Sequence, residues 1–402
     1  MQDAMEWMTI LIRWGHVMAG IAWVGTSFYF NWFDLSVRRP NETVIKKNVR
    51  GTLHEIHGGS FYYHEQYWPD TDPPRMLGHA GPAQLTFLTG MALIAILYWY
   101  GASIYLIDSQ IRALSEAHAI MISVVSFLIV WPLYHKLCKA TQNDLAVFLW
   151  VSALTVVAAL FFSNIFGGRA AFLHVGALLG TIMALNVHFV IVPNHIEMRK
   201  QIRDGVPLDR SLGEKAKRVS QHNNYFTLPV VFAMLSTHFP LAYGHTLGWL
   251  VLSLIMGFGV ALRHYRNIQL KSEKKDRRFL LMAAALLCAA IATSQVPATP
   301  TEGRQEAVSN QADSEILSIV QSRCTSCHSA NPTSEDFTTA PLGFKLDSLA
   351  QVRLGASKIL QRAVHSKDMP INNMTGMTNE EREALGNWLS AIQSKSGTPA
   401  QQ

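Results

Sequence analysis

Residues 145–163 read LAVFLWVSALTVVAALFFS and carry no charged side chain. A transmembrane helix needs roughly 20 mostly apolar residues, and in lipid its backbone polar groups must be satisfied within the segment. This stretch therefore predicts a membrane-spanning helix. The same criterion selects seven further segments, at about 7–33, 83–107, 117–134, 170–192, 221–241, 245–262 and 279–296. Arg13 is the only Lys, Arg, Asp or Glu within the eight segments.

The composition separates a long apolar part from a shorter polar one. The 402 residues are 49% hydrophobic and 15% charged, whereas soluble domains average roughly 25% charged residues. Residues 1–296 have a net charge of +8 and the remainder a net charge of −2. This pattern excludes a single soluble globule, a disulfide-rich scaffold and a disordered chain. It also argues against a nucleic-acid partner, because the basic residues do not gather on one soluble domain.

The basic residues of the loops predict the orientation in the membrane. Twenty-two Lys and Arg residues lie in loops 34–82, 135–144, 193–220 and 263–278, against two in the alternate loops 108–116, 164–169 and 242–244. Cytoplasmic loops carry the excess of basic residues. We therefore expect an inner-membrane protein of bacteria with both termini in the periplasm. The N-terminus lacks the features of a cleaved signal peptide, so we expect the first span to be retained.

After the last span, we interpret residues 297–312 as a linker and residues 313–402 as a periplasmic domain, which leaves residues 1–296 as the membrane domain. The domain contains Cys324-Thr325-Ser326-Cys327-His328. C-x-x-C-H is the motif of covalent haem c attachment, with the histidine as proximal iron ligand. Met369, which precedes Pro370, is the expected second axial ligand, with Met374 and Met377 as rivals. We expect one covalently bound haem c.

The alternative, a redox-active C-x-x-C pair, needs neither the adjacent histidine nor a methionine downstream. Local patterns also suit a small cytochrome c of class I type: a short helix over 313–323, and a capping box of Thr378 and Glu381 that opens a helix with Leu385, Trp388 and Leu389 on one face. The predicted fold is all-α, an eight-helix membrane bundle followed by this domain. We interpret Cys138 and Cys288 as buried small apolar residues.

Several histidines fall in or beside the predicted spans, where ionisable groups are costly and often functional. His16, His118, His174 and His245 are expected at similar depth on the periplasmic side. They are candidate ligands for haem b between helices, or they are packing residues that bond neighbouring helices.

Two further features are candidates for a substrate site. Arg169, next to the fifth span, is suited to an anionic ring or a haem propionate, or it extends to the membrane interface. The run His222-Asn223-Asn224-Tyr225 marks either a polar pocket or a helix cap. A histidine is also a suitable general base near neutral pH.

Several longer stretches resemble the membrane-bound, cytochrome-c-fused urate oxidases (urate hydroxylases) of bacteria. These are Trp14-Gly15-His16 with Trp23-Val24-Gly25, residues 55–62 (EIHGGSFY), 168–176 (GRAAFLHVG), 222–229 (HNNYFTLP) and Met369–Thr378. The resemblance implies oxidation of urate to 5-hydroxyisourate, with electrons passing through haem c to a soluble cytochrome c or a terminal oxidase and no peroxide formed. His16, Arg169, His174 and His222 are the candidate catalytic residues.

The resemblance weakens at residues 77–84 (LGHAGPAQ), where the family is rich in Trp with Lys and Glu. A related purine as substrate, or a non-catalytic role in electron transfer from quinol or a partner to cytochrome c, is therefore an alternative to urate oxidation. A transporter is disfavoured, because no carboxylate lies inside a predicted span to couple ion movement.

Overall fold

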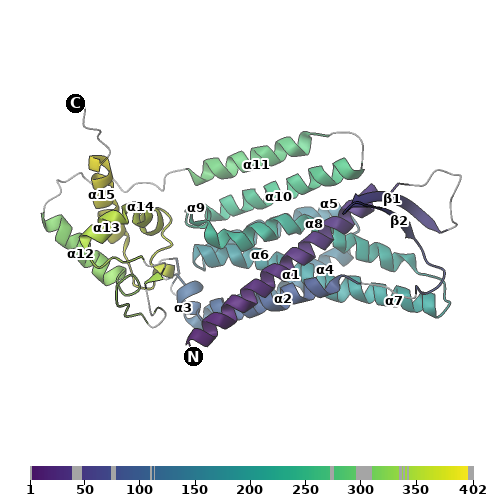
Figure 1. The fold of residues 1–402 in the computed structure, drawn as a ribbon, viewed down its shortest axis with the longest axis horizontal. Coiled ribbons are helices and arrows are strands. Elements are labelled where there is room, and N and C mark those ends of the chain that lie inside the picture. The colour runs from purple at the N-terminus through teal and green to yellow at the C-terminus, as the bar shows by residue number, and fades with distance from the viewer. Residues whose placement is uncertain are drawn as a thin grey trace.

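The computed structural model describes residues 2–38, 48–73, 78–108, 111–112, 114–271, 276–295, 310–334, 337, 340–341 and 344–396. Long helices run side by side in a bundle, with the C-terminal segment at one end and a β-hairpin at the other (Figure 1). We name these the tail end and the hairpin end. The predicted linker falls largely in 296–309, outside the described residues.

The bundle is mostly helical, as predicted. Its elements are α1 (Gln2–Ser36), β1 (Val49–His57), β2 (Ser60–Tyr67), α2 (Ala80–Ile94), the π-helical turn η2 (Ala95–Trp99), α3 (Ala102–Tyr105), α4 (Glu116–Ala140), α5 (Asp144–Ser163), α6 (Gly168–Asn186), the π-helical turn η3 (Val187–Ile191), α7 (Val192–Arg203), α8 (Arg210–Leu235), the 3₁₀ turn η4 (Ser236–His238), α9 (Pro240–Tyr243), α10 (Gly248–Lys271) and α11 (Arg278–Ser294).

Six of the described helical segments are long and apolar enough to cross a membrane: Trp7–Ser36, Ala80–Trp99, Glu116–Ala140, Asp144–Ser163, Gly168–Arg203 and Gly248–Lys271. They correspond to six of the eight predicted spans. The other two predictions fall on α8, which is helical but begins in a polar stretch at Arg210, and on α11, which is apolar but has only 17 residues. As membrane spans, these two stay predictions.

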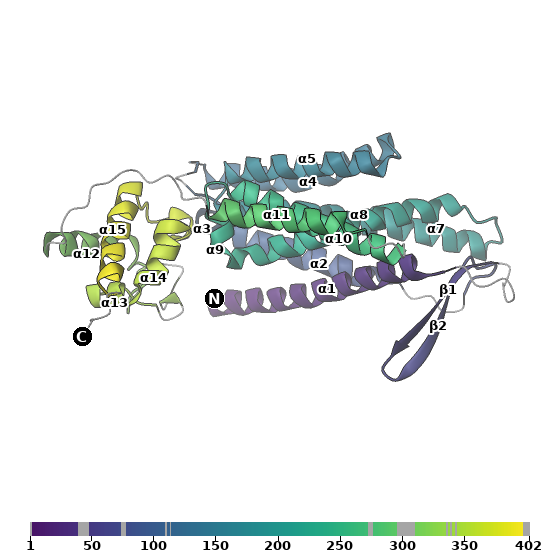
Figure 2. The same ribbon diagram turned by 90° about the horizontal axis from the view of Figure 1, so that it is seen from above.

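Helix α6 lies at the centre of the bundle and packs against α2, α4, α5 and α8. Its closest approach is to α8: a Cβ added at Gly176 would lie 2.2 Å from the Cβ of Ala233. Only glycine permits this spacing. By contrast, α1 lies on one outer side of the bundle and α4 and α5 lie on the opposite side (Figure 2). Outer faces carry exposed apolar side chains such as Leu128 and Leu281, each 68% exposed.

The hairpin departs from the predicted all-α fold. Strands β1 and β2 pair antiparallel, with His57 opposite Ser60. Gly58 and Gly59 have φ of 56° and 78°, which suits a two-residue hairpin turn that requires positive φ at both positions. A search for long apolar segments does not detect a short strand pair of mixed polarity. The hairpin joins α1 through a hydrogen bond from Tyr29 to Glu55 at 2.8 Å.

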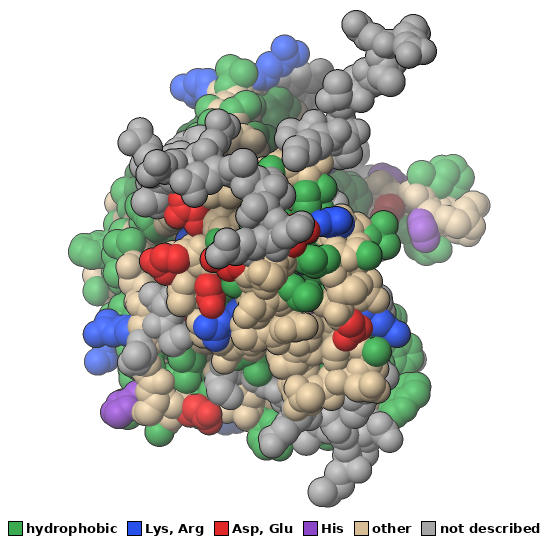
Figure 3. Space-filling view, turned by 90° about the vertical axis from the view of Figure 1, so that its left-hand side faces the viewer, with side chains coloured by type: hydrophobic (Ala, Val, Ile, Leu, Met, Phe, Trp, Pro, Cys, Tyr) green, Lys and Arg blue, Asp and Glu red, His purple; other side chains and the backbone are tan. Residues whose placement is uncertain are grey.

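The C-terminal segment has its own core. Its elements are α12 (Asn310–Arg323), α13 (Leu349–Leu354), α14 (Ala356–Ile359), η6 (Leu360–His365), η7 (Ile371–Asn373) and α15 (Asn379–Ser396). Leu385, Trp388 and Leu389 are buried in one cluster, which confirms the predicted apolar face. The capping box is also confirmed, since Thr378 and Glu381 each accept the other's backbone N–H, at 3.2 and 2.8 Å. Seen from the tail end, acidic and basic side chains are scattered over its described surface (Figure 3).

The C-terminal segment contacts the tail end of the bundle through the chain just before Met369. The hydroxyl of Tyr243, in α9, donates to Asp368 Oδ2 at 3.1 Å. A Cβ added at Gly244 would lie 2.0 Å from the carbonyl oxygen of Ser366, so the two backbones meet where there is no side chain. Asp368 is also paired with Arg362 at 2.5 Å. The loop that carries Met369 is therefore fixed against the bundle.

Candidate functional site

The C-x-x-C-H motif follows α12 without a break. The backbone N–H of Cys324 donates to Val320 O, and that of His328 donates to Cys324 O, both at 2.8 Å. This helical turn places both thiols and the imidazole on a rigid element. The cysteines are not joined by a disulfide. Burial raises the pKa of the Cys324 thiol to about 12, whereas a redox-active C-x-x-C needs a lowered thiol pKa.

The His328 ring has a fixed orientation. Its Nδ1 lies 2.8 Å from the carbonyl oxygen of Phe344. A carbonyl only accepts, so Nδ1 carries the hydrogen and Nε2 is left as the nitrogen with a lone pair. Histidines that bind metals commonly have their second nitrogen bonded to a backbone carbonyl in this way. This geometry suits an axial ligand.

The structure brings the second predicted ligand segment next to this motif. Arg323, directly before Cys324, pairs with Glu381 at 3.0 Å, and its carbonyl accepts from Thr375 Oγ1 at 3.0 Å. Arg382 is 2% exposed and donates to Met369 O at 2.7 Å and to Asn373 Oδ1 at 3.0 Å. The motif and the loop over Met369–Thr378 are thus bound to each other.

The three candidate methionines differ in environment. Met377 is fully buried in the core of the segment, whereas Met374 is 41% exposed. Met369 is partly buried at the edge of that core, together with Cys324. Of the three methionines, only Met369 shares with Cys324 a partly buried position against this core, which suits a ligand of a haem held by the motif. Cys324, Cys327, His328 and Met369 therefore fit the requirements of a covalently bound haem c.

The four histidines proposed for haem b do not form a common site. His174 is 1% exposed, and both ring nitrogens are engaged, with Ser123 Oγ and Ala170 O, each at 2.8 Å. Its ring packs against four aromatic rings, those of Tyr98, Phe127, Phe162 and Phe166. His174 is therefore a packing residue, and the space beside it is filled by side chains.

The other three histidines each make hydrogen bonds to different neighbouring residues. Nδ1 of His16 bonds Thr89 Oγ1 at 3.0 Å between α1 and α2. His118 is exposed and bonds Ser115 at the start of α4, and His245 accepts from Leu247 N at 3.0 Å. The arrangement of these described residues does not fit a haem b, and we assign none.

Arg169 lies in the first turn of α6, at the tail end of the bundle. Its Cζ is 5.8 Å from the ring centroid of Tyr105. Its Nε is buried and has no hydrogen-bond acceptor among the described residues. The adjacent Gly168 packs on Tyr243, which contacts the C-terminal segment. Arg169 is therefore close to the segment that carries the candidate haem ligands.

His222 is not part of a helix cap, because α8 begins at Arg210 with Asp209 as N-cap. The prediction of a helix start at this run is wrong, since the polar first turns of α8 precede the apolar part that the hydropathy criterion selects. His222 Nδ1 bonds the hydroxyl of Tyr134 at 2.7 Å, and Nε2 lies 3.5 Å from Asp144 Oδ1. The run is thus a polar cluster inside the bundle.

The next residues of this cluster contact other helices, and the sequence does not predict their partners. Asn223 accepts from Asn186 at 3.0 Å. Asn224 accepts from Arg263 Nε at 2.7 Å and from Asn267 at 3.1 Å. Arg263 follows directly after a predicted span and counts there only as a loop charge. Cys138 is buried as predicted, but Cys288 is exposed on α11.

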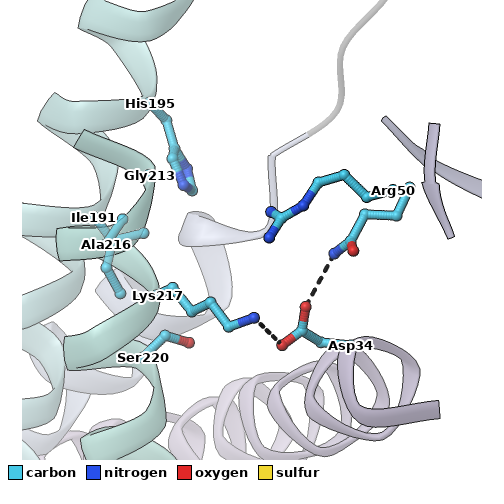
Figure 4. A pocket seen from close by; sticks show the side chains of 9 residues that line it. Asp34, Arg50, Ile191, His195, Gly213, Ala216, Lys217 and Ser220 are labelled. Atoms are coloured by element: carbon cyan, nitrogen blue, oxygen red, sulfur yellow. Dashed lines mark hydrogen bonds and ion pairs between the residues drawn. The ribbon is translucent and has the colours of Figure 1, made fainter. Parts of the chain in front are cut away.

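A cavity of about 240 Å³ opens at the hairpin end, between α1, β1–β2, α7 and α8. Its lining includes the basic groups Arg50, His195 and Lys217, together with Asp34 and Ser220. Lys217 and Asp34 reach toward each other across it, 2.8 Å apart (Figure 4). This cavity contains a mixture of charged and hydroxyl groups suited to a small polar molecule.

Comparison with known proteins gives one match. The family model described as Urate oxidase N-terminal matches residues 2–295, which is the whole described bundle. No curated protein and no solved structure matches the chain. This family indicates that the chain is a urate-related oxidoreductase. Since the match covers well over half of the chain, the chain belongs to the Urate oxidase N-terminal family.

Proposed function

We propose that this chain is a membrane-embedded oxidase of urate that delivers electrons to a haem c held by its own C-terminal segment. Urate and water give 5-hydroxyisourate, two electrons and two protons. When bound, haem c supplies a one-electron acceptor, so the two electrons leave in turn, to a soluble cytochrome c or a terminal oxidase. Molecular oxygen is not reduced at the site, and no peroxide forms.

The membrane location is supported by the apolar helices. Six segments meet the length and polarity requirements, and large apolar side chains such as Trp150 and Leu128 are more than half exposed on the outside. Such a surface is stable in lipid but not in water. The basic loops lie at the hairpin end, which we therefore assign to the cytoplasm, with the tail end in the periplasm.

The observation that carries the electron-transfer proposal is the fixed pairing of the C-x-x-C-H turn with the Met369 loop. Arg323 and Arg382 bind the two segments together, and the Phe344 carbonyl orients His328. Both devices favour iron ligation by His328 and Met369, a pairing that raises the reduction potential. A high potential suits an electron acceptor.

The candidate catalytic residues take different roles in this proposal. His222 Nε2 lies 3.5 Å from the carboxylate oxygen Oδ1 of Asp144, so this nitrogen is placed to take up a proton beside a negative charge. His16 and His174 are engaged with neighbouring helices and position those helices. Arg169, with its unpaired Nε, is placed to hold a negative charge near the C-terminal segment.

The test is an anaerobic titration of the oxidised, detergent-purified holoprotein with urate, followed by haem c absorbance. We expect haem reduction with a stoichiometry of two haems per urate and formation of 5-hydroxyisourate. Chemical reduction of the same sample gives the full-scale control. A normal chemical reduction without any reduction by urate would refute urate as the electron donor.

A second candidate, electron transfer from membrane quinol, is favoured by an apolar cavity of about 470 Å³ at the tail end. It is lined by Phe232, His238, Phe239 and Ile291 of the bundle and by Gln361 of the C-terminal segment. An apolar wall with a histidine and an amide suits a quinol head group and tail. Reduction of the haem by a short-chain quinol, but not by urate, would favour this role.

A further inference from the structure

Two buried hydrogen-bond donors belong to a pair of residues that are bonded to each other between α8 and α10. They are Nδ2 of Asn224 and Nη2 of Arg263, and neither has an acceptor among the described residues. Asn224 is 1% exposed. Buried donors without acceptors are rare and destabilise a fold. Their presence on two residues in contact points to a ligand that supplies the acceptors.

The orientation of the Asn224 amide is determined by its neighbours. Its Oδ1 accepts from Arg263 Nε at 2.7 Å and from Asn267 Nδ2 at 3.1 Å. The oxygen must face these two donors, which leaves Nδ2 as the amide atom without a partner among the described residues. Asn267 is itself fixed, because its Oδ1 accepts from Asn31 of α1 at 3.0 Å. The donor of Asn224 therefore has a defined direction.

The Arg263 guanidinium is equally fixed. Its Cζ lies 4.0 Å from the ring centroid of Phe28, in α1. Arginine binds planar acceptors through two neighbouring N–H groups, and here Nε is used by Asn224 while Nη2 is left. The group is held in position before any ligand arrives, which favours tight binding.

The cavity at the hairpin end is lined by residues one turn away from this pair on the same helices, although Asn224 and Arg263 themselves do not line it. Ser220 and Asn224 are four residues apart on α8, and Asp34 and Asn31 are three apart on α1, so each pair is about one helical turn apart. Asp34 offsets the charge of Lys217, and the remaining charge of Arg50 in the lining favours an anion over a cation. The cavity volume of about 240 Å³ is below the roughly 300–1,000 Å³ of sites for drug-sized ligands. It suits a smaller molecule.

We propose that Asn224 and Arg263 form a capture site for a small planar anion of the purine class, namely urate, which enters through this cavity from the side of the basic loops. Urate presents adjacent oxygen and nitrogen acceptors along its edges, and these match two neighbouring donors. The proposal rests on the proposed function and concerns binding, not the position of the oxidation.

The experiment is equilibrium binding of radiolabelled urate to the detergent-purified holoprotein, with haem reduction recorded on the same samples. Asn224→Asp keeps Oδ1 and its pairing with Arg263 but replaces the donor by a second acceptor. Arg263→Lys keeps the charge but removes the paired N–H groups. Arg266→Gln, on the same helix at an exposed position, is the matched control. Arg169→Lys tests the rival arginine at the tail end.

We expect both Asn224→Asp and Arg263→Lys to weaken urate binding by about 30-fold or more, with unchanged thermal unfolding and unchanged binding in the control. Unchanged affinity in both variants, while the unmodified protein still oxidises urate, would overturn the site and leave the function intact. A loss of urate affinity in Arg169→Lys alone would also overturn the Asn224–Arg263 site and leave the proposed function intact. An unmodified protein that binds no urate would overturn both proposals. Binding without haem reduction would support the site and refute the oxidation.

Discussion

The bundle and the C-terminal segment are both helical and both bury apolar side chains, such as Phe162 and Phe166 in the bundle, but their polar residues and their surfaces differ. In the bundle, small and polar residues such as Gly176, Ser123 and Asn224 lie inside, and large apolar residues cover the outside. In the C-terminal segment, Leu385 and Leu389 are buried and charged residues cover the surface. The difference is what the proposed membrane location requires: an apolar surface for lipid around the bundle and a charged surface for water around the segment.

The two regions also carry their chemistry differently. The candidate haem ligands Cys324, Cys327 and His328 occupy one helical turn, so they are recognisable within five residues. The polar cluster of the bundle is assembled from α1, α4, α6, α8 and α10, with hydrogen bonds between residues up to 236 positions apart. A functional motif of consecutive residues can be recognised in a sequence, whereas a cluster formed by side chains from several helices is found only in the structure.

The largest expected effect is the loss of covalent haem from the C-terminal segment. Replacing Cys324 and Cys327 together by serine should abolish covalent haem, because serine hydroxyls do not form the thioether bonds. Haem staining of the denatured protein measures this, and oxidation of urate should cease with it. Cys288→Ser, on the exposed face of α11, is the control and should keep full haem content. Haem retained without the two thiols would refute the assignment.

The next effect concerns the methionine of the C-terminal segment. Met369→Ala should lower the haem reduction potential by on the order of 0.1 V or more, because a thioether ligand favours the reduced iron. Redox titration measures the shift. Met374→Ala, at an exposed position, should leave the potential unchanged. The reverse result would identify Met374 as the ligand.

A packing change should affect the bundle without altering the haem. In Gly176→Val, the new Cβ would lie only 2.2 Å from the Cβ of Ala233. We expect a loss of about 1–3 kcal/mol in the free energy of unfolding, measured by thermal unfolding in detergent. Gly180→Ala is the matched control, since its Cβ would meet Val230 at an ordinary 3.9 Å. Equal stability of the two variants would contradict the α6–α8 contact.

The smallest effect is a pH dependence confined to the C-terminal segment. Burial raises the pKa of Glu381, but Arg323 and the backbone N–H of Thr378 outweigh it, so the pKa is lowered. A carboxyl group whose pKa is lowered on folding stabilises the fold at pH values above its ordinary, unfolded-state pKa. This contribution is lost as the pH falls through the lowered pKa of the folded state. Glu381→Gln should therefore cost ~0.5–1 kcal/mol at neutral pH and almost nothing well below about pH 4.

Thermal unfolding of the C-terminal segment, followed by haem absorbance at several pH values, measures this difference. A Glu381→Gln variant with the same stability as the unmodified protein at neutral pH would show that the Arg323 pair contributes nothing.

Much of this arrangement follows from the sequence. Apolar length predicts the six long helices, and local motifs predict α12, the capping box at Thr378 and the contents of the C-terminal core. Three features are not predictable in this way. The β1–β2 hairpin depends on Gly58 and Gly59 in a loop of mixed polarity. The start of α8 lies in a polar region that hydropathy ignores. The partners of Asn224 depend on how α1 and α10 are placed, which no local pattern specifies.

The contact between Tyr243 and Asp368 has a kinetic consequence. Because the C-terminal segment is part of the same chain and contacts the bundle, the bundle and the proposed electron acceptor do not need to find each other by diffusion. In the proposed reaction, the rate of the internal step per molecule is then independent of protein concentration, and dilution slows only the later encounter with an external acceptor. Raising the concentration of an external acceptor therefore does not let it compete with the internal transfer of the first electron that leaves the substrate.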